Sequence, residues 1–352
     1  MRAKLAKVFV VVATVVGCAP SPSEPRNPDP VPVVPPLEAV PFELLGPGKI
    51  AFERIGGGGA IVTLYVIDAD ARTSAHFFDN TVIEGASISP DGRHVAYAAY
   101  AGNATLYDTY VANIDGTAAA HVTTFNRQEG PPTWTPDGAK ILILGADGFV
   151  PYQVYSQSPV ANPPDRTQLT HFAYPTTGPL TCPIIDDNDV RVSMSPQGRL
   201  AFDCFWMEID VLASDGTLVA TYKAPRDDQS HWASVVAPTW SPDGSKLAFL
   251  EATSIQTTGV MLSMALKVMN ADGTNVTTLV TKPVANAHFN GSWSGFANYS
   301  LCWTADGSRI VFNIPETDLV GHLWVIGADG SGVAQLTSAA DAYDRSVSCT
   351  RA

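Results

Sequence analysis

The sequence predicts an all-β protein assembled from repeated four-stranded antiparallel units. One observation is a phrase of the type Ser/Thr-Pro-Asp-Gly, which recurs along the chain and is followed each time by an apolar strand. The other is an Asp-Gly phrase that recurs between these copies, again directly after an apolar strand. A phrase that returns every ~40–60 residues indicates an array of equivalent supersecondary units.

The first phrase has the composition of a tight turn. Proline presets φ at the second position, Asp accepts backbone N–H bonds, and Gly permits a positive φ. Apolar residues flank the phrase on both sides, so each copy predicts a hairpin of two buried strands. The copies occupy residues 89–92, 135–138, 195–198, 241–244 and 304–307, with Gln197 and Ala305 as the two departures from the pattern.

The second phrase predicts a second hairpin in each unit, because Asp-Gly between two strands is a strong turn signal. Two hairpins give four antiparallel strands, which form one blade of a β-propeller. The copies occupy residues 113–117, 213–217, 270–274 and 327–331, with a weaker copy at 68–72.

Residues 240–249 together with 270–274 resemble the TolB-like family of PD40 (WD40-like) β-propeller repeats. In that family Trp-Ser-Pro-Asp-Gly, an apolar strand and then Asn-Ala-Asp-Gly-Thr form the blade signature. Trp134 and Trp303 hold the place of Trp240 in other units. The resemblance covers residues from about 48 to 352 and implies the propeller fold. It implies no TolB role, because a Pro-rich segment stands in place of the N-terminal domain of TolB itself.

The number of second strands predicts six blades. These strands begin near Lys49, His94, Lys140, Leu200, Lys246 and Arg309. An inner strand precedes all of them except the one at Lys49, and residues 344–349 can supply the missing strand. We therefore predict a six-bladed β-propeller over residues 48–352, closed by the C-terminal strand pairing into the N-terminal blade. Closure leaves no unpaired sheet edge.

The N-terminus has the features of an export signal. Basic residues precede the apolar run 8–16, which is too short to span a bilayer. Residues 15–18 resemble the bacterial lipobox, which implies that residues 1–17 are a lipoprotein signal peptide and that Cys18 is lipidated. An ordinary signal peptide with an incidental cysteine is the alternative. Ala19, where Asp would retain a lipoprotein in the inner membrane, indicates a lipid-anchored protein of the outer membrane in the bacterial cell envelope.

Residues 18–47 are predicted to form a tether. Ten prolines lie between residues 19 and 47, and Pro-rich sequence favours an extended polyproline II conformation. A disordered tail without a role fits the same composition. The net charge of −13 argues against nucleic acid and anionic lipid surfaces as partners. We expect a monomer that meets the membrane only through the lipid on Cys18.

Four cysteines besides Cys18 suggest disulfides in an exported chain. Cys302 and Cys349 fall on the inner strands of adjacent predicted blades, while Cys182 precedes the fourth blade and Cys204 ends its second strand. We predict the pairs 182–204 and 302–349. Four buried free thiols are the alternative, and the lack of Cys-x-x-Cys spacing argues against zinc.

The long connections indicate where a ligand would bind. Both Asp-Gly turns of a blade fall on one face of the ring (the turn face), so the variable connections fall on the opposite face (the loop face). Aromatic and imidazole side chains in these connections predict a ligand platform; the alternative is that they only cover the ends of the blades. The candidate residues are His231, Trp232, His288, Phe289, Trp293, Phe296 and Tyr299.

Signs of metal binding and catalysis are few. Asp186, Asp187 and Asp189 gather the hard oxygen ligands that calcium prefers, although a solvated acidic loop is the favoured explanation. No Gly-x-Ser-x-Gly elbow occurs, because residues 291–295 place Trp293 where the nucleophile would stand. We expect no required cofactor, with calcium as the one possible ion.

These observations predict a non-catalytic binding scaffold for a protein or cell-envelope glycan on the loop face. The alternative is a metal-assisted polysaccharide lyase or hydrolase of the propeller type. The oligogalacturonate lyases, which are similar six-bladed propellers, carry metal-binding histidines, and His231 and His288 are the first candidates for that role here. A purely structural spacer is the third possibility.

Overall fold

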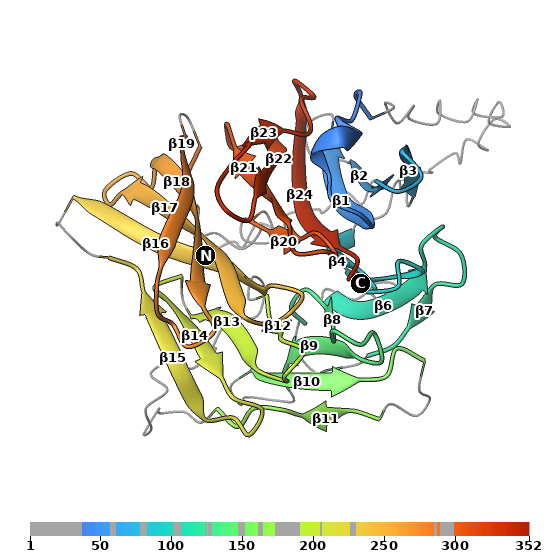
Figure 1. Cartoon of the computed structure of the whole chain (residues 1–352). Helices are drawn as coiled ribbons and strands as arrows, with labels where there is room; N and C mark the ends of the chain where they lie inside the picture. Colours follow the sequence, from blue (N-terminus) through green and yellow to red (C-terminus); the bar gives the residue numbers. More distant parts are fainter. Residues whose placement is uncertain are drawn as a thin grey trace, which may run out of the picture. The chain divides into compact units, whose positions relative to one another are not determined.

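The structure is a computed structural model, and it describes residues 37–56, 61–77, 83–100, 107–123, 125, 129–146, 152–160, 165–172, 191–204, 206–225, 230–284, 287–288 and 299–351. Apart from a short 3-10 helix, η1 (Phe42–Leu44), the regular elements of this part are the strands β1 to β24. They form four sheets of four strands and one sheet of eight strands (Figure 1). No helix in these ranges is long and apolar enough to cross a membrane.

Each four-stranded sheet is a blade whose strands follow in chain order. One blade consists of β4 (Ile83–Ile88), β5 (His94–Tyr100), β6 (Tyr107–Asn113) and β7 (Ala120–His121), and the next of β8 (Thr133–Trp134), β9 (Ile141–Gly145), β10 (Gln153–Gln157) and β11 (Thr167–Gln168). A third consists of β12 (Ser193–Met194), β13 (Leu200–Cys204), β14 (Glu208–Leu212) and β15 (Leu218–Lys223). The fourth consists of β16 (His231–Trp240), β17 (Lys246–Ile255), β18 (Met261–Asn270) and β19 (Thr277–Pro283). All strand pairs within these blades are antiparallel.

The eight-stranded sheet contains two antiparallel halves. One consists of β20 (Leu301–Trp303), β21 (Arg309–Pro315), β22 (Gly321–Gly327) and β23 (Ala334–Gln335); the other, the closing blade, consists of β24 (Ala342–Cys349), β1 (Lys49–Gly56), β2 (Ile61–Asp68) and β3 (Thr73–Phe77). A single parallel pair, Gly321 with Tyr343, joins the halves. Because β24 pairs with β1, the predicted closure of N-terminal and C-terminal strands in one sheet is confirmed (Figure 1).

The recurring turn phrase is held by its own side chains. The Ser241 hydroxyl donates to Asp243 Oδ1 at 2.6 Å and accepts the Lys246 N–H at 3.0 Å. Asp243 Oδ1 also accepts the N–H of Ser245, and Gly244 has a φ of +69°. The bonds from Ser241 and Ser245 hold the pKa of Asp243 below its ordinary value. The bonds that shape the turn thus come from residues within the phrase and directly after it.

Neighbouring blades are joined at their innermost strands. The Trp134 indole donates to the Ser87 carbonyl at 2.9 Å, and the Trp303 indole donates to the Thr239 carbonyl at 3.1 Å. Apolar side chains fill the space between successive sheets, and the same position of four second strands carries a fully buried Phe. These residues are Phe52, Phe202, Phe249 and Phe312.

Three inner strands contain a bulge at the same place. Gly85, Ala237 and Ser346 have φ values of +66°, +58° and +54°. Each lies three residues before the last residue of its strand. The ladders of β4, β16 and β24 shift register at these points. A bulge redirects the side chains that precede it. Here those side chains lie toward the loop face.

Two buried charge pairs join β24 to β1. Arg54 donates from Nε and Nη2 to the two oxygens of Asp344 at 2.6 and 2.8 Å. On the next register position, Arg345 Nε donates to Glu53 Oε2 at 2.9 Å. All four side chains are buried. Glu53 Oε1 also accepts the Ala86 N–H at 2.7 Å, which links the closing blade to β4.

The end of the predicted tether packs against the closing blade. Glu38 lies 3.2 Å from the Arg54 guanidinium, and η1 follows it. Gly46 approaches the β20–β21 turn so closely that a Cβ there would lie 2.8 Å from Thr304. Residues 37–47 are therefore partly held by the propeller.

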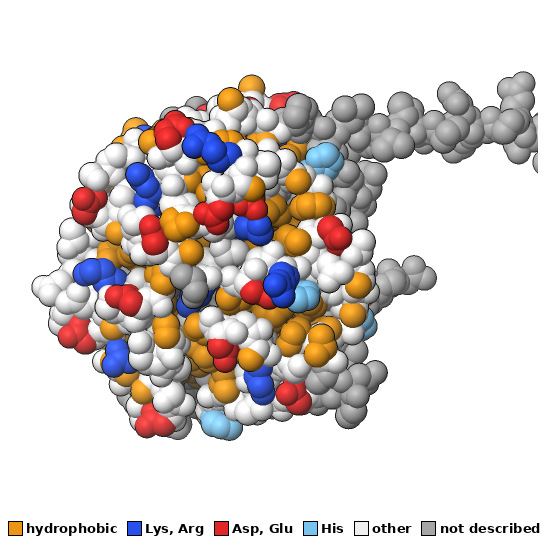
Figure 2. All heavy atoms as spheres, turned by 45° about the vertical axis from the view of Figure 1, so that its right-hand side comes forward, with side chains coloured by type: hydrophobic (Ala, Val, Ile, Leu, Met, Phe, Trp, Pro, Cys, Tyr) orange, Lys and Arg blue, Asp and Glu red, His pale blue; other side chains and the backbone are white. Residues whose placement is uncertain are grey.

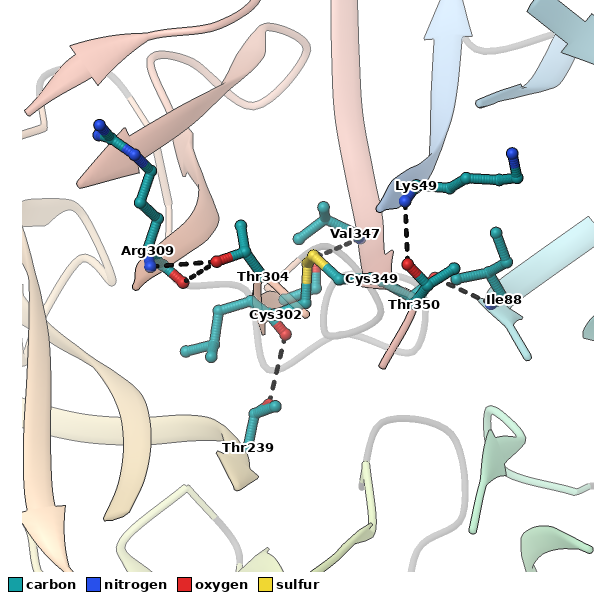
Figure 3. The surroundings of a disulfide bond; sticks show 12 residues. Lys49, Ile88, Thr239, Cys302, Thr304, Arg309, Val347, Cys349 and Thr350 are labelled. Carbon is teal, nitrogen blue, oxygen red and sulfur yellow. Dashed lines mark hydrogen bonds between the residues drawn. A yellow bond between two sulfur atoms is a disulfide. The ribbon is translucent and has the colours of Figure 1, made fainter. Parts of the chain in front are cut away.

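The predicted disulfide between Cys302 and Cys349 is present and joins β20 to β24 (Figure 3). Backbone-to-hydroxyl bonds surround it: the Val347 N–H donates to Ser300 at 2.8 Å and the Ile88 N–H donates to Ser348 at 3.0 Å. Cys204 is disulfide-bonded as well. Its predicted partner Cys182 lies outside the described residues, so that pairing stays a prediction.

Substituting Asp344 with Ala should destabilise the propeller by about 3–5 kcal/mol, because it leaves the Arg54 charge buried without its bidentate partner. The double variant Arg54→Met with Asp344→Leu should recover most of that loss, since it removes both charges. Urea unfolding midpoints of the two variants measure the difference. Equal losses in the single and double variants would show that packing rather than charge pairing governs the closure.

Substituting Gly85 with Ala should cost more than the ~1–2 kcal/mol of a left-handed non-glycine residue, because the new Cβ would lie 2.3 Å from Pro131 Cβ. Gly216→Ala is the matched control, since Gly216 has a φ of +84° and nothing lies within 4 Å of its would-be Cβ. Thermal unfolding should separate the two variants, with the larger loss at Gly85. A loss at Gly216 as large as at Gly85 would contradict the close contact.

Candidate functional site

A central channel runs between the innermost strands of the ring. It contains a cavity of about 90 Å³ lined by residues of β4, β8, β12, β16, β20 and β24 or their immediate flanks. Since about 10–15 Å³ of such space holds one water molecule, the cavity accommodates several waters.

Hydroxyl side chains in the channel wall bind neighbouring blades together. Thr133 Oγ1 donates to the Val192 carbonyl at 2.6 Å, and Ser193 Oγ accepts the Trp240 N–H at 3.2 Å. Thr239 Oγ1 donates to the Leu301 carbonyl at 3.3 Å (Figure 3). In the middle of the channel, the hydroxyl groups of the wall thus serve to join neighbouring blades.

The loop-face end of the channel carries a group of charged side chains, which we call the charged funnel: Glu53, Glu84, Arg191, Asp203 and Arg345. Arg191 lines the channel, and its charge acts on both Glu84 and Asp203. Arg345 acts on Glu84 and is bonded to Glu53. Glu84 and Arg345 directly precede the bulges at Gly85 and Ser346, which accounts for their position at the funnel.

Asp203 is the most perturbed acid of the funnel. It is 1 % exposed, and neither carboxylate oxygen has a hydrogen-bond partner among the described residues. Burial raises its pKa to about 7, against the opposing effects of nearby backbone N–H groups and the Arg191 charge. Burial also raises the pKa of Glu84, against the charge of Arg345. Asp203 therefore changes its charge near neutral pH.

Glu129 is a second acid whose pKa burial raises to about 7. It accepts hydrogen bonds from the hydroxyls of Thr109, at 2.6 Å, and Thr123. These bonds join β6 and the segment after β7 to the segment before β8. The role of Glu129 is consequently to hold two blades together.

An exposed rim lies at the loop-face end of β16 to β19 and on the β21–β22 hairpin. Trp232 is 54 % exposed and Leu319 is 70 % exposed. His288 is oriented by Asp318, which accepts its backbone N–H at 2.7 Å and contacts its Nδ1 at 2.9 Å. Tyr299, by contrast, is buried in the apolar core. Of the predicted platform, His231, Trp232 and His288 are at the surface.

His231 and His288 lie at the same end of one blade but do not converge. His231 pairs with Ile255, Ile255 N–H donates to Val260, and Val260 pairs with His288. Three strand spacings separate the two histidines, roughly 14 Å at ~4.8 Å per spacing, so one metal ion cannot bind both. Within the described ranges no group of three or more His, Cys, Asp or Glu side chains could hold a metal.

Some predicted site residues lie outside the described residues: Asp186, Asp187, Asp189, Phe289, Trp293 and Phe296. The charged funnel and a hollow around Arg351 on the turn face were not predicted from the sequence. Asp203 carried a detectable signal, because it interrupts the apolar strand 200–204 directly after a core Phe. On the face shown in Figure 2, basic and acidic side chains are interspersed.

No protein-family model matches the chain, and no curated protein matches its sequence. Solved structures do resemble it. TolB from Acinetobacter baumannii superposes with a TM-score of 0.61 at 15 % identity, over 88 % of this chain and 69 % of that one. Hydrazine synthase from Kuenenia stuttgartiensis gives 0.58 at 11 % identity, over 88 % of this chain and 47 % of that one. A periplasmic gluconolactonase from Pseudomonas aeruginosa gives 0.51 at 11 % identity, over 86 % and 99 %.

At such identities these similarities concern the fold alone. They support a β-propeller like those of TolB and of lactonases. They assign no activity to this chain.

Asp203→Asn should change how stability depends on pH. The pKa of Asp203 in the folded protein is about 7, against an ordinary value of 3.8. The stability that the protonated carboxyl contributes is therefore fully present below pH ~4 and is lost as the pH rises through 7. The Asn variant should therefore gain on the order of 2–4 kcal/mol over the natural chain at pH 8 and little at pH 4. Urea unfolding at both pH values measures this.

The reciprocal variant is Asn313→Asp. Asn313 follows Phe312 as Asp203 follows Phe202, and it is equally buried. It should lose less stability than Asp203 does between pH 4 and 8, because the Ser300 N–H at 2.8 Å favours the charged carboxylate. If neither variant changes the pH profile, Asp203 is solvated or paired at neutral pH, contrary to its surroundings here.

Proposed function

We propose that this chain is an exported six-bladed β-propeller, anchored through Cys18, that binds a protein or cell-envelope glycan on its loop face without catalysing a reaction. Six innermost strands around one channel support the blade number. The signal and lipobox-like residues 1–18 support export and anchoring to the envelope.

The exposed rim is the observation that carries the binding role. Trp232 presents a large ring to solvent on a rigid ten-residue strand, and Leu319 and Leu262 add exposed apolar surface on β22's hairpin and β18. Exposed aromatic side chains on a rigid frame are typical of interaction surfaces. The His288–Asp318 contact fixes the hairpin beside them, so this surface is ordered before a partner arrives.

A propeller enzyme is the second candidate, and Asp203 is the observation in its favour. A carboxylic acid with a pKa of about 7 beside an arginine suits general acid–base chemistry. At 1 % exposure, however, Asp203 cannot touch a polysaccharide. The metal-assisted version would need ligands other than a shared pair of His231 and His288. The binding role therefore explains the exposed apolar side chains of the loop face, which a catalytic role of Asp203 does not explain.

The test compares two double variants for binding to envelope fractions and to purified cell-wall glycan. Trp232→Ala with Leu319→Ala changes the loop face, whereas Val276→Ala with Val333→Ala removes exposed apolar surface beside the turns of the opposite face. We expect the loop-face variant to lose binding at least ~10-fold, the effect of removing an interface hot spot, and the turn-face variant to bind normally. Equal binding by both variants would contradict the proposal.

Elemental analysis of the purified chain separates binding from catalysis. A stoichiometric transition metal that disappears on substitution of His231 or His288 would favour the metal-assisted enzyme. Calcium by itself would be compatible with a structural ion and with the binding role.

A further inference from the structure

The turn face has a hollow at its centre whose floor contains Arg351. Three cavities of about 440, 460 and 510 Å³ adjoin one another there, and Arg351 lines all three. It also lines the turn-face end of the central channel. Turn prolines of several blades form the walls, among them Pro90, Pro136 and Pro242. We call this feature the Arg351 hollow.

The closing strand holds Arg351 in this position. Directly after β24, the Thr350 N–H donates to the Lys49 carbonyl at 2.9 Å, and the Arg351 N–H donates to the Pro90 carbonyl at 3.1 Å. The side chain then extends across the ring, where Nη1 lies 3.5 Å from the Met194 carbonyl on β12. The guanidinium therefore spans the channel mouth from the closing blade to a distant blade.

Among the described residues Arg351 forms no ion pair, and the long contact to Met194 is its one side-chain hydrogen bond. Arg54 and Arg345 differ from it, since each is bonded to a buried carboxylate. A guanidinium has five N–H donors, so most of the hydrogen-bonding capacity of Arg351 is unused. Burial lowers its pKa to about 10, which leaves it charged at neutral pH.

The other charges around the hollow are already engaged. Asp91, Asp137 and Asp306 each accept a turn hydroxyl, at 2.6, 2.6 and 2.7 Å. Asp70 accepts the Gly48 N–H at 3.0 Å. Lys49 is paired with Asp68, and Lys140 with Asp165 at 3.6 Å. The Arg351 charge is thus the one in this hollow that faces a cavity without a partner among the described residues.

We propose that the Arg351 hollow binds a carboxylate group of a ligand or partner. A carboxylate matches the planar fork of a guanidinium with two parallel hydrogen bonds. The ionised Asp91, Asp137 and Asp306 at the rim oppose a doubly charged phosphate and favour a carboxylate that has a cationic neighbour. The site lies on the face opposite the exposed rim, so it is independent of the proposed function.

Acetate titration of the intact chain with ¹⁵N-labelled arginine tests the proposal. The Nε–H signal of Arg351 is identified from its loss in Arg351→Lys, or in Arg351→Gln if the first variant does not fold. We expect acetate to shift this signal saturably, with half-saturation on the order of 10–100 mM for a single charge-assisted contact. The Nε–H signal of Arg54, already bonded to Asp344 at 2.6 Å, is the internal control and should not move.

Chloride and phosphate at matched ionic strength complete the experiment. A shift that is linear in acetate, or equal in chloride, would mean that Arg351 only closes the channel and would overturn the proposal. A larger shift with phosphate than with acetate at equal concentration would overturn the carboxylate preference. The envelope-binding variants Trp232→Ala and Leu319→Ala leave this titration unchanged, so failure of one proposal is distinguishable from failure of the other.

Discussion

The pairing of β24 with β1 is the contact on which the rest of the molecule depends. It brings two pairs of opposite charges into register, Arg54 with Asp344 and Glu53 with Arg345, and buries all four. Burying a charge costs free energy unless an opposite charge and hydrogen bonds compensate. Both pairs are formed only when β24 lies against β1, so the two pairs contribute to stability only in the closed ring. The disulfide between Cys302 and Cys349 secures the same strand from its other side.

The closing strand also supplies a residue at each level of the channel. Arg345 belongs to the charged funnel at the loop face, Cys349 lies in the channel wall, and Arg351 follows at the turn face. The two ends of the channel therefore depend on the same ring closure. This arrangement separates two surfaces with different chemistry: an exposed aromatic and aliphatic rim on one face, and on the other a hollow in which Arg351 has no ion pair among the described residues.

The buried acids show how the repeat tolerates polar residues in its core. Glu53 accepts a backbone N–H from the next blade, and Asn313 accepts the Ser300 N–H at 2.8 Å. Asp203 occupies the equivalent strand position without such a bond within hydrogen-bond geometry. Burial raises the pKa of Asp203 to about 7. The same scaffold position can therefore be a structural acceptor in one blade and a titratable group in another.

The sequence by itself determined the features that depend on neighbouring residues in the chain. Turn phrases such as residues 241–244 fold through bonds within a few residues, so the hairpins, the four-stranded blades and the closure by β24 were predictable. The pair Cys302–Cys349 followed because adjacent inner strands must lie side by side. Only the tertiary structure decided which charges and rings meet across the ring. It separated His231 from His288 by two intervening strands, buried Tyr299, and placed Arg191 beside both Glu84 and Asp203. These relations join positions far apart in the chain, and they depend on bulges, side-chain direction and the path of the last residues, for which no local pattern exists.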